Sequence, residues 1–301
     1  MRRAPVLAVL ALGTALLAGC GSGSHSADPS GQQSDGASAS ATAAGTAGGT
    51  AGPAITGGYV ALGDSYSAAP GVPTVQFASG CVRSTNNYPH LIAAALPGLA
   101  LTDVTCSAAT TSSLSAAQHT AAALSLHVPP QLDALSATTR YVTVGIGGND
   151  VGLFNALVGC MTKGDCKATY GDQADSAVET IGEHVTAALQ AVHAKAPHAE
   201  VALVGYPQLV PASGSCAALP LQEADRAFLH QLFIDISQRM AQAAKDADAR
   251  FVDVLDASRG HDICSADPWI NGPHNTAQAF AFHPFEEEQR AVAALVVKAL
   301  G

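Results

Sequence analysis

A serine directly after an apolar stretch is the first residue in this chain with a clear chemical potential. Ser65 ends the tripeptide Gly63-Asp64-Ser65, and this follows the strand-forming run Tyr59-Val60-Ala61-Leu62. The hydroxyl group is therefore predicted at the carboxyl end of a strand, the edge at which open α/β sheets bind ligands. A serine there is a candidate nucleophile, provided that a base and oxyanion donors lie nearby.

An asparagine and a histidine could supply those partners. Asn149 lies in the glycine-rich run 145–150, which ends another β-branched stretch, and its side-chain amide could donate to a developing oxyanion. His283 precedes a proline in a loop near the end of the chain, where it could accept the proton of Ser65. His261 and His274 are competing candidates for the base.

The elements that must position these residues alternate between strands and helices. Strands are expected from Tyr59 and over residues 99–104, 140–146, 200–204 and 250–255. Helices are expected over residues 88–96, 113–125, 129–135, 178–192, 221–247 and 286–300. Five strands separated by helices predict an α/β domain, residues 55–301, with a five-stranded parallel sheet covered on both faces.

Composition restricts the class of partner. The chain has 301 residues and a net charge of −10, and no basic stripe that could neutralise phosphates is visible. We therefore expect no nucleic-acid partner, and we expect a monomer.

The amino terminus reads as a targeting signal. Arg2 and Arg3 precede an apolar run over residues 4–17 that is too short to span a bilayer comfortably, as in a signal peptide. The run leads to Leu17-Ala18-Gly19-Cys20, which is similar to the bacterial lipobox. Residues 1–20 are thus predicted to be a lipoprotein signal peptide with Cys20 as the lipidated residue. The alternative is an ordinary secretory peptide in which Cys20 is incidental.

The segment that follows should act as a tether. Residues 21–54 consist mostly of glycine, serine, alanine and threonine, so they lack the bulky apolar side chains that a core requires. The predicted protein is exported and anchored by lipid to the outer face of the cell membrane, or secreted if the anchor is absent.

The remaining six cysteines suggest three disulfides, as is usual in exported domains. Sequence alone leaves several connectivities open. Consecutive pairing is the simplest, and the short loop between Cys160 and Cys166 favours it. The expected pairs are Cys81–Cys106, Cys160–Cys166 and Cys216–Cys264. A metal site is the alternative, but none of the six has the CxxC-type spacing of metal ligands.

Taken together, these motifs resemble those of the SGNH (GDSL) hydrolases. Gly63-Asp64-Ser65, Gly147-Gly148-Asn149-Asp150 and His283-Pro284 match that family in order and spacing over essentially the whole domain. The secreted bacterial esterases and lipases with three disulfides are most similar. Their Cys-Ser-Gly-Ala block corresponds to Cys106-Ser107-Ala108-Ala109, and their Asp-Pro-Trp segment to Asp267-Pro268-Trp269.

The resemblance implies a flavodoxin-like three-layer α/β/α sandwich that hydrolyses carboxylic esters, of small molecules or lipids, through an acyl-enzyme. Ser65 would be the nucleophile and His283 the base. The backbone N–H groups of Ser65 and Ala108 and the side-chain amide of Asn149 would hold the oxyanion. No metal and no organic cofactor is implied.

Among the departures from the family pattern, two concern the predicted site residues. Ala108 stands where relatives often have glycine, although its backbone N–H survives the change. Phe280 stands where many relatives have the aspartate that orients the histidine, and we expect its main-chain carbonyl to accept the Nδ1–H of His283 instead. Asp262 and Asp267 are back-up candidates, but their spacing does not match. These departures leave one alternative function, a non-catalytic surface lipoprotein that keeps the fold to bind glycan or lipid.

Overall fold

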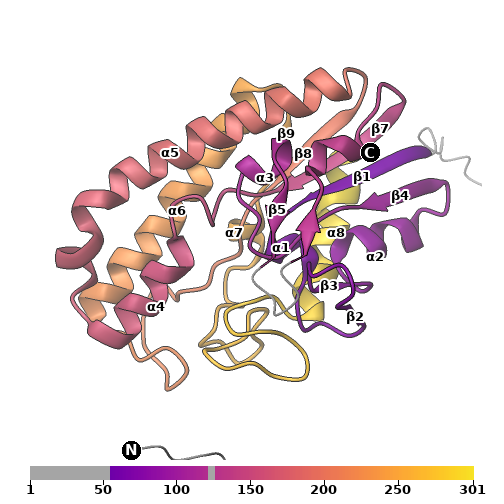
Figure 1. Ribbon diagram of the computed structural model, residues 1–301. Coiled ribbons are helices and arrows are strands. Elements are labelled where there is room, and N and C mark those ends of the chain that lie inside the picture. The colour runs from indigo at the N-terminus through magenta and orange to yellow at the C-terminus, as the bar shows by residue number, and fades with distance from the viewer. Residues whose placement is uncertain (1–54, 121–125) are drawn as a thin grey trace, which may run out of the picture. The chain divides into compact units, whose positions relative to one another are not determined.

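The computed structural model describes residues 55–120 and 126–301 of the chain (Figure 1). The predicted signal peptide with Cys20 and the predicted tether over residues 21–54 lie outside the described residues. No helix in the described ranges has both the length and the apolar character needed to cross a membrane.

A five-stranded parallel sheet forms the centre of the domain, as predicted. The strands, in spatial order, are β4 (Leu99–Asp103), β1 (Gly57–Gly63), β7 (Thr139–Gly145), β8 (Glu200–Val204) and β9 (Arg250–Val252). All neighbouring pairs are parallel. The first strand of the sheet along the chain is β1. The next, β4, pairs on one side of β1, and the later strands β7, β8 and β9 add in turn on its other side. This is the flavodoxin-like order, and its switch point lies between β1 and β7.

Helices cover both faces of the sheet, which completes the predicted three layers (Figure 1). Alternate residues of β1 point to opposite faces, because successive side chains of a strand do so. Tyr59 and Ala61 pack with α2 (Tyr88–Ala95) and α8 (Glu286–Leu300). Val60 and Leu62 belong to the larger core on the other face, which α5 (Cys166–Lys195) and α6 (Glu223–Asp246) complete.

Shorter elements connect these layers. They are the helices α1 (Ser65–Ala68), α3 (Ser112–Ser115), α4 (Leu153–Lys163) and α7 (Val254–Ala257), the 3₁₀ turn η1 (Gln131–Ala134), and the strand pairs β2 (Val75–Gln76) with β3 (Arg83–Ser84) and β5 (Gln118–His119) with β6 (His127–Val128).

Several predicted elements are wrong in extent. The helix expected over residues 178–192 is α5, which begins twelve residues earlier at Cys166, and α4 was not predicted. The helix expected over residues 113–125 is only the single turn α3, because Ala116 is extended (φ −126°, ψ 154°) and the chain then forms β5. Residues 121–125 lie outside the described part. The strand expected over residues 250–255 ends at Val252, since the side chain of Asp253 accepts the Asp256 N–H group at 3.0 Å and starts α7. A local hydrogen bond to the backbone thus ended a β-type pattern.

The cysteines pair consecutively. Cys81 bonds Cys106, Cys160 bonds Cys166 and Cys216 bonds Cys264, with sequence separations of 25, 6 and 48 residues. The second pair joins α4 to the start of α5, and the first joins the loop after β4 to the segment before β3.

Candidate active site

Ser65 is held at the carboxyl end of β1 by the shape of the turn. Gly63 has φ 154°, and a side chain there would come within 2.7 Å of the Gly145 carbonyl oxygen, so the strand must end in glycine. Asp64 caps α1, because its Oδ1 accepts the Tyr66 N–H group at 2.9 Å. Ser65 is the first residue of α1 and is largely buried. The predicted strand-edge position is therefore correct.

Gly63 is clamped from two sides. The buried side-chain amide of Gln131 accepts the Gly63 N–H group at 2.8 Å and donates to the Gly63 carbonyl at 3.0 Å. The Cys106 N–H group donates to the same carbonyl at 3.0 Å, and the Asp64 N–H group donates to Gly145 at 2.9 Å. These bonds join the turn that carries Ser65 to the loops that follow β4 and β7.

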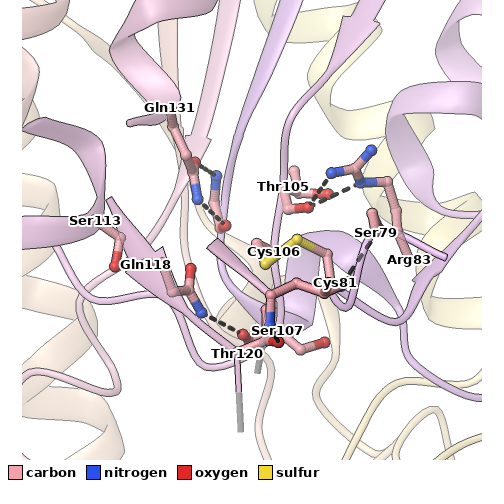
Figure 2. The surroundings of a disulfide bond; sticks show 12 residues. Ser79, Cys81, Arg83, Thr105, Cys106, Ser107, Ser113, Gln118, Thr120 and Gln131 are labelled. Atoms are coloured by element: carbon pink, nitrogen blue, oxygen red, sulfur yellow. Dashed lines mark hydrogen bonds between the residues drawn. A yellow bond between two sulfur atoms is a disulfide. The ribbon is translucent and has the colours of Figure 1, made fainter. Parts of the chain in front are cut away.

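The loop after β4 carries Ala108, and the Cys81–Cys106 disulfide fixes the start of this loop next to Ser107 (Figure 2). The Ser107 N–H group donates to the Cys81 carbonyl at 3.0 Å, and Gln118 donates through Nε2 to the Ser107 carbonyl at 2.8 Å. Ala108 is exposed and has φ 64°, a left-handed conformation that glycine adopts without strain. Ala108 therefore adopts a backbone conformation that favours glycine.

Asn149 meets this loop directly. Its side-chain Nδ2 donates to the Ala109 carbonyl at 2.9 Å. The two positions predicted as oxyanion donors, Ala108 and Asn149, therefore lie on neighbouring loops at the same sheet edge as Ser65. Further along, Asp150 accepts the Thr111 N–H group at 3.0 Å, which joins the two loops a second time.

His283 lies in the loop before α8. The prediction that the Phe280 carbonyl orients its ring is wrong. Its Nδ1 donates to the carbonyl of Ala281 at 2.7 Å. The Phe280 carbonyl instead accepts the His283 backbone N–H group at 3.1 Å and the Asn271 amide at 3.0 Å. Phe282, with φ 61°, turns the loop so that the imidazole faces the Ala281 carbonyl rather than that of Phe280.

The loop of His283 contacts the turn of Ser65 through Tyr66. The Tyr66 ring lies 5.4 Å from the His283 ring, centroid to centroid, and its hydroxyl group donates to the Phe282 carbonyl at 2.5 Å. Tyr66 directly follows Ser65. The structure thus brings the loops of Ser65 and His283 into contact, although the two residues lie at opposite ends of the domain sequence.

Comparison with known proteins identifies this arrangement. Residues 61–290 match the model of the GDSL-like Lipase/Acylhydrolase family. The chain belongs to this family. It is therefore a carboxylic ester hydrolase, and the SGNH (GDSL) resemblance is confirmed.

Several relatives are similar over most of this hydrolase. Lipase 2 of Streptomyces coelicolor is 40% identical over 259 residues, covering 81% of this chain and 85% of the relative. The crystal structures of phospholipase A1 from Streptomyces albidoflavus and of an extracellular lipase from Streptomyces rimosus are each 30% identical, with TM-scores of 0.69 and 0.71. Each comparison covers 81% of this chain and 100% of the solved one.

Burial sets the electrostatics of the hydrolase's site. It lowers the pKa of His283, and the hydrogen bond to the Ala281 carbonyl opposes this shift. The imidazole is therefore mostly neutral at pH 7, the form that can accept a proton. Burial also raises the pKa of Asp64 to about 7, against the opposing hydrogen bonds from Tyr206 and the Tyr66 N–H group.

The back-up residues serve other purposes. His261 stacks on Trp269 with ring centroids 4.2 Å apart, and its Nδ1 bonds the Asp267 carbonyl at 2.8 Å. Asp262 accepts the backbone N–H group two residues further on at 2.9 Å. Within the described residues, none of these side chains hydrogen-bonds His283. In the described part of the chain, no three His, Cys, Asp or Glu side chains are grouped so that they could hold a metal ion.

Sequence reasoning missed two buried side chains that contact the site loops, Gln131 and Tyr206. Tyr206 lies two residues after β8, at the same sheet edge, and this position was its available signal. Gln131 gave no such signal, because nothing in the sequence around it indicates that its side chain hydrogen-bonds Gly63.

Proposed function

We propose that this hydrolase cleaves carboxylic esters through a covalent acyl-enzyme on Ser65. The Ser65 hydroxyl oxygen attacks the ester carbonyl carbon while its proton passes to Nε2 of His283. The bond to the leaving alcohol then breaks, and the alcohol takes that proton. Water, activated by His283, hydrolyses the acyl-serine, releases the acid and restores the serine.

We infer three donors for the oxyanion: the backbone N–H groups of Ser65 and Ala108 and the Nδ2 group of Asn149. The contact between Asn149 and the Ala109 carbonyl supports this role, because it holds the amide beside the loop of Ala108. Removing one such donor typically slows the chemical step by about 10²–10³-fold.

The observation that carries the proposal is the orientation of His283. Because a carbonyl oxygen only accepts, the bond to Ala281 requires the proton on Nδ1 and leaves the Nε2 lone pair free. Tyr66 holds this ring beside the turn of Ser65. A neutral imidazole with an unprotonated Nε2, on a loop that contacts the turn of a strand-edge serine, supports general-base activation of that serine.

The test is hydrolysis of p-nitrophenyl acetate and butyrate by the purified protein, its Ser65→Ala variant and its His283→Ala variant. We expect turnover by the wild type and a loss of at least about a thousandfold in both variants. A fluorophosphonate probe should label the wild type on the peptide that contains Ser65. Labelling of another serine, or full activity of Ser65→Ala, would refute the mechanism.

We propose acyl esters of lipids as the first substrate class to test. Relatives named lipase and phospholipase A1 support this choice. A series of p-nitrophenyl esters from C2 to C16, followed by phosphatidylcholine and triacylglycerol, would define the acyl preference. Activity restricted to acetyl esters would exclude long-chain lipids as substrates.

We further propose that Cys20 carries a lipid anchor and that residues 21–54 tether a monomeric domain, residues 55–301, above the membrane. Three disulfides support export, since such bonds persist in oxidising compartments. Expressed in a bacterial host that lipidates proteins, the wild type should fractionate with membranes and incorporate labelled fatty acid, whereas Cys20→Ala should do neither. Equal release of both proteins would refute the anchor, and gel filtration tests the monomer.

A further inference from the structure

We propose that Tyr206 is a positioning residue for the ester-cleaving step, and that its hydroxyl group sets the distance between the nucleophile Ser65 and the oxyanion donor Asn149. The inference rests on the proposed function. It adds a residue that the family motifs in this sequence do not include.

One oxygen atom joins the two loops. The Tyr206 hydroxyl group donates to Oδ2 of Asp64 at 2.5 Å and accepts the Gly148 N–H group at 2.8 Å. Asp64 directly precedes Ser65, and Gly148 directly precedes Asn149. The Tyr206 side chain is 4% exposed, so both bonds lie away from water, where their geometry is more tightly held.

Backbone pairing alone does not fix this distance. The ladder between β1 and β7 ends at the pair Gly63 and Gly145, and Asp64 makes one further bond to Gly145. Ser65 and Asn149 lie beyond that point, on turns that leave the sheet. Tyr206 follows β8, the neighbour of β7, and its side chain reaches across the β7 loop to Asp64.

The Tyr206 side chain passes close to the backbone of Gly148. A Cβ atom built there would lie 3.0 Å from both Cζ and the hydroxyl oxygen of Tyr206. Any larger residue would push the loop of Asn149 away from the phenol. The close approach of Tyr206 and Phe154 therefore explains why a glycine precedes Asn149.

The carboxyl group of Asp64 connects Tyr206 to the nucleophile. While Oδ2 accepts the phenol, Oδ1 caps α1 through the Tyr66 N–H group at 2.9 Å. Burial raises the pKa of Tyr206 well above its usual range, so the phenol keeps its proton and remains a donor. The Tyr206 and Tyr66 rings also pack in a T-shaped arrangement, at 5.2 Å between centroids, and Tyr66 in turn contacts His283.

The test is Tyr206→Phe, which keeps the ring and removes the hydroxyl group. We expect kcat for p-nitrophenyl butyrate to fall about 10- to 100-fold, as small misplacements of catalytic groups do, with KM changed less than about threefold. Tyr59→Phe is the matched control. Tyr59 is fully buried in the opposite core layer, and its hydroxyl group hydrogen-bonds the Thr143 hydroxyl at 2.9 Å. It should lower the melting temperature comparably and keep kcat within about twofold.

A double-mutant cycle separates positioning from general destabilisation. If Tyr206 acts through Asn149, the change Tyr206→Phe should lower kcat less than about threefold when Asn149→Ala is already present. An equal fold-loss in both backgrounds would overturn the inference, as would a Tyr206→Phe enzyme with kcat within twofold of the wild type. A wild type that is inert toward every ester would instead refute the proposed function itself, before the cycle is read.

Discussion

The imidazole of His283 is oriented by the main chain, because its Nδ1–H group donates to the Ala281 carbonyl oxygen at 2.7 Å. In a triad, a carboxylate holds the corresponding nitrogen and stabilises the imidazolium that forms. A neutral carbonyl fixes the same tautomer with a weaker electrostatic effect. Phe280, at the position where many relatives have the aspartate, therefore removes a charge without removing the orientation of the ring.

Because the Ala281 carbonyl orients His283, removing the carboxylate of Asp267 should leave catalysis intact. Asp267 is the acidic residue that accompanies His261, and its side chain is 79% exposed. We expect Asp267→Ala to keep kcat within about twofold and to change the melting temperature little. A loss near the 10⁴-fold cost of removing a triad aspartate would mean that Asp267 reaches His283 during turnover.

The pH dependence of kcat/KM should follow the lowered pKa of His283. In the proposed mechanism the neutral imidazole is the base, so activity should rise with pH through its pKa and be constant above it. Because burial lowers that pKa below the ordinary 6.5, the half-maximal point should fall at a pH below 6.5. Initial rates across pH 4–8 measure it, and a midpoint above 6.5 would contradict the structure.

Ala108→Gly should be tolerated. The alanine has φ 64°, which costs a non-glycine residue roughly 1 kcal/mol, whereas glycine gains chain entropy on unfolding of similar size. We expect a melting temperature within about 2 °C of the wild type and kcat unchanged or raised, since the backbone N–H remains in place. A large loss of kcat would show that the methyl group itself contacts substrate.

Glu288→Gln should stabilise the protein at alkaline pH. Glu288 is 2% exposed in α8, and burial raises its pKa to about 8, against the bond from the Gln289 amide at 2.7 Å. The folded state keeps this proton up to about pH 8, whereas the unfolded state loses it near 4.5. Stability from this group is therefore present below pH 4.5 and lost as pH rises toward 8.

Thermal melts at pH 5 and pH 9 measure the effect. The wild type should lose several °C more than Glu288→Gln between these two conditions. Asp64, whose pKa is also raised, contributes a fall of the same sign to both proteins. Parallel profiles for the two proteins would show that Glu288 is not the group responsible.

The Cys81–Cys106 disulfide should matter for rate as well as stability. Replacing both cysteines by serine frees a 25-residue loop at a cost of about 3–4 kcal/mol, and it loosens the segment that leads to Ala108. We expect kcat to fall about tenfold. The matched control removes Cys216–Cys264, which closes 48 residues and should cost similar stability without changing kcat. Equal kcat in both variants would contradict a role in the site.

Local patterns in the sequence were enough for much of this protein. The apolar run before Ser65 and the β-branched run before Asn149 each predicted a strand with chemistry at its end. The carboxyl ends of parallel strands lie at the same edge of a sheet, so Ser65 and Asn149 were expected at one edge. The even number of cysteines likewise indicated three disulfides without any knowledge of their surroundings.

The tertiary structure decided what local patterns do not encode. Which carbonyl accepts the Nδ1–H group of His283 depends on the turn at Phe282, whose φ is 61°, and the sequence spacing pointed to the wrong residue. The link from Tyr206 to Asp64 spans 142 residues, and the one from Gln131 to Gly63 spans 68. Such bonds form only after the strands have paired, and they leave no periodic signal in either segment. The sequence alone therefore predicted which residues would carry the chemistry, and only the folded packing decided which groups contact them.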